Sequence, residues 1–93
     1  LVQSGAATYA ANNIRVNAIA PGLLRSEMAQ PLIQSKTALQ ASEQMHPLGR
    51  IGDPAEVASL AEWLLVGESE WVTGQIFGID GGLGTVRPRV RVN

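Results

Sequence analysis

Asn13-Ile14-Arg15-Val16-Asn17-Ala18-Ile19-Ala20-Pro21-Gly22 is the stretch that decides the fold class of this 93-residue chain. Apolar residues occupy both faces of the extended segment, which is typical of a parallel strand covered by helices on both sides. We therefore predict a strand over residues 14–20, stopped by Pro21-Gly22. Ligands of open α/β sheets bind outside the carboxyl ends of such strands, so the segment indicates a nucleotide-cofactor site.

The sequence on either side of this strand predicts a strand–helix–strand unit. An Ala-rich helix precedes it and ends at Asn12-Asn13, because asparagine tolerates the left-handed conformation that closes a helix. Asp53-Pro54-Ala55-Glu56 predicts a capped helix start, and Gly67 closes that helix. A second strand is predicted over residues 75–79, stopped by Asp80-Gly81-Gly82. Together these elements predict an α/β fold with a right-handed crossover between parallel strands.

The segment between the first strand and the crossover helix is less regular. Residues 23–35 lack a clean period and are predicted as a long loop or a short irregular helix, followed by a helix over residues 34–45. Long segments at strand ends are more often functional than decorative.

Composition excludes several classes of site. The chain has no cysteine and only one histidine, His46, which excludes disulfides, thiolate metal sites and multi-histidine clusters within it. The formal net charge is −1, no apolar run approaches the length of a membrane span, and no signal-peptide pattern opens the chain, so we expect a cytoplasmic protein without membrane contact. The basic tail, with Arg87, Arg89 and Arg91, is interpreted as solvated rather than as a nucleic-acid contact, because it has no aromatic residue for stacking.

Three blocks together resemble the short-chain dehydrogenase/reductase family, in that family's order and spacing. The first is residues 13–22. The second is His46-Pro47-Leu48-Gly49-Arg50-Ile51-Gly52-Asp53-Pro54-Ala55-Glu56-Val57-Ala58, and the third is Trp71-Val72-Thr73-Gly74-Gln75 with Asp80-Gly81-Gly82. The resemblance covers residues 1–83, the expected C-terminal segment of an NAD(P)-binding Rossmann-type domain, and leaves 84–93 as the basic tail. It implies the C-terminal part of a doubly wound parallel sheet.

The resemblance implies hydride transfer between NAD or NADP and an alcohol or carbonyl substrate. The family's chemistry uses a Tyr-x-x-x-Lys pair, in which the lysine lowers the tyrosine pKa. Tyr9 is the only tyrosine, and Asn13 stands four residues on in place of lysine. The family's Gly-rich phosphate turn is also missing from the sequence. We therefore assign no catalytic residue here and expect the catalytic part of the enzyme to precede Leu1.

The second wall of the cofactor site is what the resemblance transfers to this chain. Gly22, after Pro21, would let the backbone approach the nicotinamide closely. Leu24 matches the position whose backbone pairs with the carboxamide, and Ser26 keeps a hydroxyl where the family usually has threonine. Met28 resembles the apolar residue over the ring. The stretch from Leu23 to about Met45 matches the substrate-covering lobe, and the family also implies a homo-oligomer.

Each of these positions also has a purely structural interpretation. Pro21-Gly22 alone is a strand stop, Ser26 a surface serine, and Met28 more often a core residue than a cofactor contact. His46 is interpreted as structural, Asp80 as part of a turn or subunit-contact motif, and Trp63 and Trp71 as packing residues. At the level of the whole chain, the alternative to an oxidoreductase is a non-catalytic piece: a truncated product, or an assembly module that docks on a complete homologue. The open edge of the first strand favours self-association of such a piece.

Overall fold

The strands and helices follow the predicted order along the chain. A computed structural model describes residues 1–87. Its elements are α1 (Val2–Tyr9), the 3-10 helix η1 (Ala10–Asn12), β1 (Ala18–Pro21), the 3-10 helix η2 (Glu27–Ala29), α2 (Gln30–Gln34), α3 (Lys36–Met45), α4 (Pro54–Val66) and β2 (Ile76–Ile79). The tail residues Arg89 and Arg91 lie outside the described residues, whereas Arg87 is exposed.

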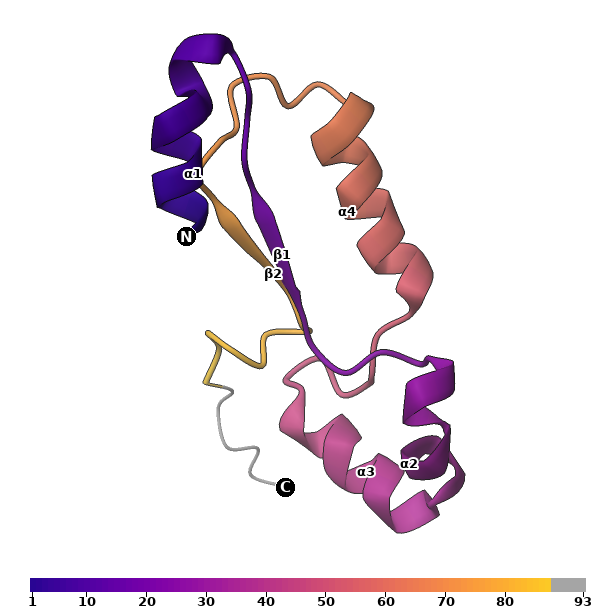
Figure 1. Cartoon of the computed structure of the whole chain (residues 1–93). Helices are drawn as coiled ribbons and strands as arrows, with labels where there is room; N and C mark the ends of the chain where they lie inside the picture. The colour runs from indigo at the N-terminus through magenta and orange to yellow at the C-terminus, as the bar shows by residue number, and fades with distance from the viewer. Residues whose placement is uncertain (88–93) are drawn as a thin grey trace.

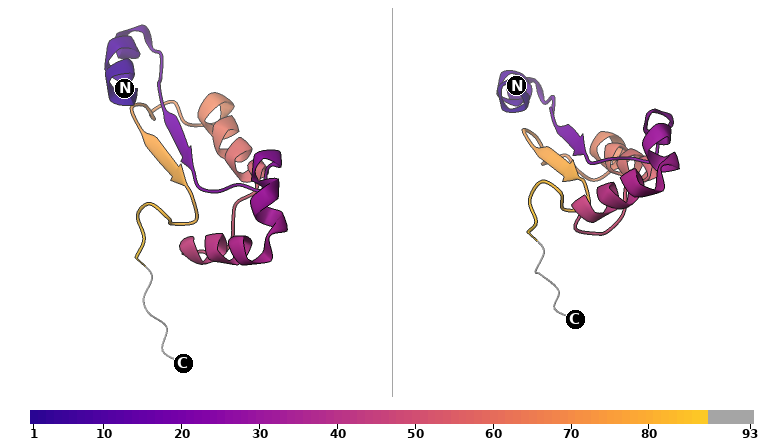
Figure 2. Two further views of the ribbon diagram at one scale, coloured as in Figure 1. Left: turned by 60° about the horizontal axis from the view of Figure 1, so that its bottom comes forward. Right: turned by 90° about the horizontal axis from the view of Figure 1, so that it is seen from below.

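The two strands form a parallel pair between two helices. Ala18 pairs with Ile76 and Pro21 with Ile79, so the described part of the chain contains a two-stranded sheet. Helices α1 and α4 lie on opposite sides of these strands (Figures 1 and 2). A parallel pair with helices on both sides confirms the predicted α/β class, because α4 is the crossover between β1 and β2.

The first strand is shorter than predicted, starting at Ala18 instead of Ile14. The preceding residues are held by several side-chain hydrogen bonds and by one backbone bond, from the Gly74 N–H to the Val16 carbonyl at 2.8 Å, instead of by a continuous ladder. Arg15 Nη1 and Asn17 Nδ2 both donate to the Val72 carbonyl, at 3.1 and 3.0 Å. Asn17 Oδ1 also accepts from the Gln75 N–H at 3.1 Å, which delays the start of β2 to Ile76. The boundary shifts because these hydrogen bonds join residues more than 50 positions apart.

Helix ends follow local sequence signals. Asn13 adopts φ 59° after η1, as predicted for the residue that closes the first helix. The helix predicted from residue 34 begins at Lys36, because the Ser35 hydroxyl accepts from the Ala38 N–H at 3.3 Å and so caps it. Helix α4 carries the predicted capping box at its start and ends before Gly67.

The irregular stretch after β1 forms a separate lobe beyond the carboxyl ends of the strands (Figure 1). It contains η2, α2 and α3, with Pro31 in the first turn of α2. Both interpretations of residues 23–35 were therefore partly right: a loop leads into two short helical segments. The lobe covers the side of the sheet where a ligand is expected.

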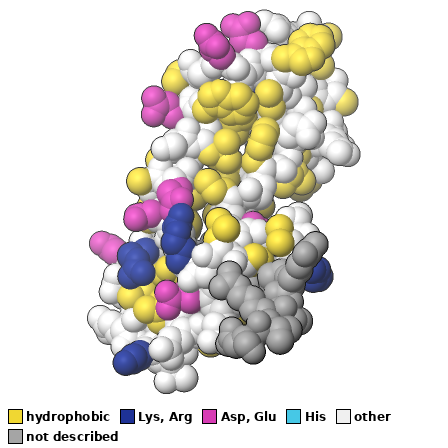
Figure 3. Space-filling view, turned by 180° about the vertical axis from the view of Figure 1, so that it is seen from behind, with side chains coloured by type: hydrophobic (Ala, Val, Ile, Leu, Met, Phe, Trp, Pro, Cys, Tyr) yellow, Lys and Arg dark blue, Asp and Glu magenta, His cyan; other side chains and the backbone are white. Residues whose placement is uncertain are grey.

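Much apolar surface remains uncovered in residues 1–87. Only Ala6, Ala29 and Ile51 are buried among the apolar residues described. The prediction that both tryptophans pack is wrong for this chain: Trp71 is 98% exposed and Trp63 is 42% exposed. Apolar side chains gather over the upper half of the face opposite to that of Figure 1 (Figure 3). In the same described range, no helix is long and apolar enough to span a bilayer.

Candidate functional site

The end of β1 is packed tightly at Gly22. Its N–H donates to the Ile79 carbonyl at 3.1 Å, which extends the parallel ladder one residue past the strands. A Cβ atom at this position would lie 3.0 Å from Asp80 Cα and 3.0 Å from His46 Nε2. The sequence interpretation gave Gly22 a role in ligand approach. The structure adds a second reason for glycine, which is the close contact between the strand end and the turn that follows β2.

Leu24 presents a free backbone edge. It forms an isolated parallel bridge with Gly52, in which the Arg25 N–H donates to the Gly52 carbonyl at 2.8 Å and the Gly52 N–H donates to the Leu23 carbonyl at 2.9 Å. In this pattern the neighbours of Leu24 use the bridge, so its own N–H and C=O face away from Gly52. The arrangement leaves one donor and one acceptor side by side, the pair that an amide group would complement.

Ser26 and Met28 follow on the same segment. Ser26 is the N-cap residue of η2, with extended φ −131° and ψ 170°, and its side chain makes no capping hydrogen bond. Met28 is 95% exposed, so its interpretation as a core residue is wrong within residues 1–87. Within the described residues, the Ser26 side chain therefore caps no helix and the Met28 side chain is not buried in a core.

His46 joins the lobe to the backbone that follows β1. It is buried, at 5% exposure. Its Nδ1 lies 2.6 Å from the Ser42 carbonyl and its Nε2 accepts from the Leu23 N–H at 3.3 Å. The structural interpretation of His46 holds, but its partner Leu23 is 23 positions away and had no signal in the sequence.

A cavity of about 350 Å³ lies between the lobe, the start of α4 and the turn after β2. Its lining includes Leu24, His46, Arg50, Glu56 and Asp80. Of the five predicted cofactor residues, only Leu24 lines it. The other four (Pro21, Gly22, Ser26 and Met28) lie on the continuous segment outside this cavity.

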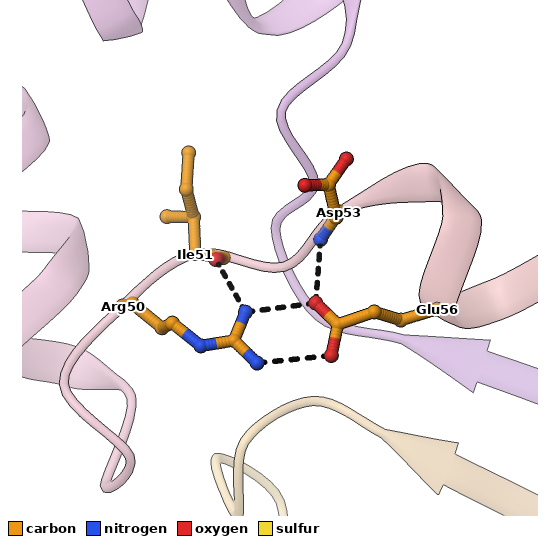
Figure 4. Close-up of polar contacts among 4 residues, drawn as sticks. All are labelled: Arg50, Ile51, Asp53 and Glu56. Carbon is orange, nitrogen blue, oxygen red and sulfur yellow. Dashed lines mark hydrogen bonds and ion pairs between the residues drawn. The ribbon is translucent and has the colours of Figure 1, made fainter.

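The ion pair between Arg50 and Glu56 is exposed and orders the start of α4 (Figure 4). The two nitrogens of Arg50 donate to the two carboxylate oxygens of Glu56 at 2.8 and 2.9 Å. Glu56 Oε1 also accepts from the Asp53 N–H at 3.0 Å. This hydrogen bond, from the N-cap backbone to the Glu56 side chain, is one of the two contacts that define the capping box. The hydrogen bond from Arg50, followed by that from the Asp53 backbone, lowers the Glu56 pKa to about 2.

The turn after β2 is held by Asp80, as predicted. Its two carboxylate oxygens accept from the Gly82 and Gly84 N–H groups, both at 3.0 Å. No cluster of three metal-ligating side chains occurs in the part of the chain that the structure describes. Asp80 is therefore occupied with its own turn.

Ser69 is a further structural residue that the sequence did not reveal. Its side chain is 2% exposed, and its hydroxyl lies 2.8 Å from the Trp63 carbonyl and 3.2 Å from the Leu64 carbonyl. Arg15 Nη2 donates to the same Leu64 carbonyl at 2.7 Å. These contacts tie the end of α4 to the segment before β1. A serine two residues after the helix-closing Gly67 was the only local hint.

Comparison with known proteins identifies relatives of the chain. The sequence profile of the family described as enoyl-(acyl carrier protein) reductase matches residues 1–84. The chain is 43% identical over 83 residues to the 3-oxoacyl-[acyl-carrier-protein] reductase FabG of Thermotoga maritima, covering 89% of this chain and 33% of that protein.

Solved structures of relatives have the same arrangement. The solved structure of a 4-hydroxyisoleucine dehydrogenase complexed with NADH superposes with a TM-score of 0.85 at 30% identity, covering 89% of this chain and 34% of that one. The RhlG/NADP active-site complex of Pseudomonas aeruginosa gives 0.81 at 35% identity, covering 88% of this chain and 33% of that one. The chain thus spans about a third of the length of these relatives. On this sequence match and this shared fold, the chain belongs to the short-chain dehydrogenase/reductase family.

Proposed function

We propose that this chain supplies the nicotinamide wall and the substrate lobe of an NAD(P)-dependent oxidoreductase that transfers a hydride between the cofactor and an alcohol or carbonyl substrate. The observation that carries the proposal is the free backbone edge of Leu24 at the carboxyl end of β1. Solved relatives of similar fold hold NADH or NADP, which supports the same cofactor class here.

Each residue of the wall has a distinct role in this proposal. The N–H and C=O of Leu24 would pair with the carboxamide of nicotinamide as a neighbouring strand would. The Ser26 hydroxyl would hydrogen-bond the carboxamide or pyrophosphate. Pro21 and Gly22 would set the backbone against one face of the ring, and the exposed Met28 side chain would cover it.

Catalysis needs an acid or base that none of these residues provides. In the family this is a tyrosine whose pKa a neighbouring lysine lowers, and the sequence has Asn13 four residues after its single tyrosine. We propose that residues 1–83 act as one segment of a larger cofactor-binding domain, with catalytic groups outside these 93 residues. The chain alone should show no oxidoreductase activity and bind NAD(P) no tighter than about millimolar, about −4 kcal/mol. A cytoplasmic location also stays a prediction.

A homo-oligomer belongs to the same proposal. The exposed apolar residues Leu65, Val66, Trp71 and Ile76 lie on α4, on the loop after it and on β2, with exposures between 65% and 98%. Exposed apolar surface of this extent is typical of a contact surface.

The second candidate is a non-catalytic module that docks on a complete homologue. The observation that favours it is the outer edge of β1, which no described strand pairs. Ile14, just before this strand, is 50% exposed. An unpaired apolar strand edge is a template for another strand.

Saturation-transfer NMR, which tolerates weak affinity and self-association, tests the first candidate. Nicotinamide mononucleotide should receive saturation at its ring and carboxamide end, whereas adenosine monophosphate, which lacks the carboxamide, should receive little. Ser26→Ala should reduce the effect roughly two- to fivefold, the value of one hydrogen bond. Ser59→Ala, an exposed serine on α4, is the matched control and should leave it unchanged. Equal saturation of both nucleotides, or indifference to Ser26→Ala, would contradict the proposal.

Native mass spectrometry of the chain mixed with a complete family member separates the two candidates. A mixed complex without nucleotide contact supports the module. Nucleotide contact by the chain itself supports the cofactor wall.

A further inference from the structure

We propose that His46 is a positioning residue that holds the Leu23 backbone at the cofactor wall in its neutral form and releases it on protonation. The ligand of that wall rests on the proposed function. The hydrogen-bond switch itself rests only on the geometry around His46.

The partners of the ring fix its tautomer. The Ser42 carbonyl, 2.6 Å from Nδ1, can only accept, so Nδ1 must carry a hydrogen. The Leu23 N–H, 3.3 Å from Nε2, can only donate, so Nε2 must keep its lone pair. Both conditions hold together only in the neutral Nδ1–H tautomer. Protonation would put a hydrogen on Nε2, where it faces the Leu23 N–H and removes that donor's acceptor.

The ring has little room to escape this conflict. His46 is 5% exposed, and the space above Gly22 is so narrow that a Cβ there would lie 3.0 Å from Nε2. If the ring cannot move, Leu23 must move instead, and its displacement would disturb the contacts of both of its neighbours, Gly22 and Leu24. The Leu23 carbonyl accepts from Gly52 in the bridge that orients Leu24, and Gly22 is bonded to Ile79. Protonation of one buried ring would therefore disturb the Leu24 edge.

The charged groups around the ring do not offer a substitute partner. Arg50 and Glu56, from the turn and α4, line the same cavity but neutralise each other as a direct ion pair. Asp80, from the turn after β2, also lines it, and its carboxylate is held by the Gly82 and Gly84 N–H groups. Glu43, one turn earlier on α3, contacts His46 through its backbone carbonyl.

The sequence makes the test unambiguous, because His46 is the only histidine in the chain. Histidine is the side chain whose ordinary charge change falls between about pH 5 and 8. Two non-titrating variants separate the two hydrogen bonds. His46→Gln can place an oxygen near the Nε2 position and keep an acceptor for Leu23, whereas His46→Asn keeps only a donor for Ser42.

Hydrogen exchange of the full chain, read by mass spectrometry with residue-level fragmentation, measures the Leu23 N–H. The Ala18 N–H, bonded to the Gln75 carbonyl at 2.9 Å, is the internal reference. When the pH is lowered from about 7.5 until the His46 ring is protonated, Leu23 protection relative to Ala18 should fall roughly tenfold in the unmodified chain. It should stay high at both pH values in His46→Gln and low at both in His46→Asn.

Either of two exchange results would overturn the proposal: pH-independent Leu23 protection in the unmodified chain, or equal protection in the two variants. Long-range nitrogen NMR of the His46 ring needs no variant and should show the Nδ1–H tautomer at about pH 7.5. An Nε2–H tautomer would also overturn the proposal. None of these readings involves nucleotide. Loss of nicotinamide contact would therefore refute the proposed function alone.

Discussion

Replacing Ser69 with alanine tests how the end of α4 is fixed to the rest of the fold. The Ser69 hydroxyl lies within hydrogen-bond distance of both the Trp63 and Leu64 carbonyls, but it has a single hydrogen to share between them. Removing it from a buried site would cost about 1–3 kcal/mol if it left a carbonyl without a donor.

The structure predicts a destabilisation by Ser69→Ala at the lower end of that range. The Trp63 carbonyl keeps the Gly67 N–H at 3.0 Å, and the Leu64 carbonyl keeps Arg15 Nη2 at 2.7 Å. No carbonyl is orphaned, so the loss is that of one net hydrogen bond, about 1 kcal/mol. The opening equilibrium of the segment should rise by a factor of about 5.

The assay is hydrogen exchange at the Gly67 and Val72 N–H groups, whose acceptors are Trp63 and Ser69. Ser59→Ala, within α4, is the matched control, since the Ser59 hydroxyl donates only to the Ala55 carbonyl on an exposed face of that helix. It should change protection by less than about twofold, because alanine is the better helix former. Equal effects of the two substitutions would refute the role of Ser69. A loss above about twentyfold would show that the remaining donors do not hold the two carbonyls.

Three further predictions concern the strand end, the start of α4 and the apolar face. Gly22→Ala should destabilise the strand end by about 1–3 kcal/mol, because the new methyl group would lie 3.0 Å from the Asp80 Cα. Gly52→Ala should cost less, because its closest contact, at 2.9 Å, is the movable end of the Leu24 side chain. Equal loss of hydrogen-exchange protection at the Gly22 N–H in the two variants would contradict this prediction. The pKa of Glu56 is lowered from 4.5 to about 2, so its stabilisation of the α4 start should be complete above 4.5 and disappear as pH falls through about 2. Carbon NMR of the Glu56 carboxyl should show that midpoint, Glu56→Gln should abolish the pH dependence of α4, and a midpoint near 4.5 would contradict the ion-pair geometry. Trp71→Glu should reduce concentration-dependent self-association in light scattering, since Trp71 is 98% exposed on the apolar face; a monomer at every concentration in the unmodified chain would argue against that surface.

Local patterns in the sequence predicted most of the elements. The capping box at Asp53 and Glu56 and the left-handed Asn13 involve neighbours within about one turn, so the residues alone specify them. Exposure was harder to predict. Trp63 and Trp71 were expected to pack, yet burial depends on which element covers a side chain, and the described residues leave Trp71 98% and Trp63 42% exposed.

The cofactor residues divide in the same way. The sequence nominated Pro21, Gly22, Leu24, Ser26 and Met28 through a family resemblance, and their contact with a cofactor stays a prediction. The structure contributes the direction of the Leu24 backbone groups, which follows from its bridge to Gly52. A residue 28 positions away, counted from 24 to 52, sets that direction, and no local pattern encodes it.

By itself the sequence determined the parallel strand that ends at Pro21-Gly22 and the helices around it, because periodicity, caps and turn residues act over a few positions. The family was indicated by the resemblance of three motif blocks. Only the tertiary structure decided why Gly22 must lack a side chain, which backbone groups Leu24 leaves free and what His46 holds. The physical reason is distance along the chain. Strand end, lobe and final turn meet in space only after folding, and close packing there converts separate residues into one hydrogen-bonded unit.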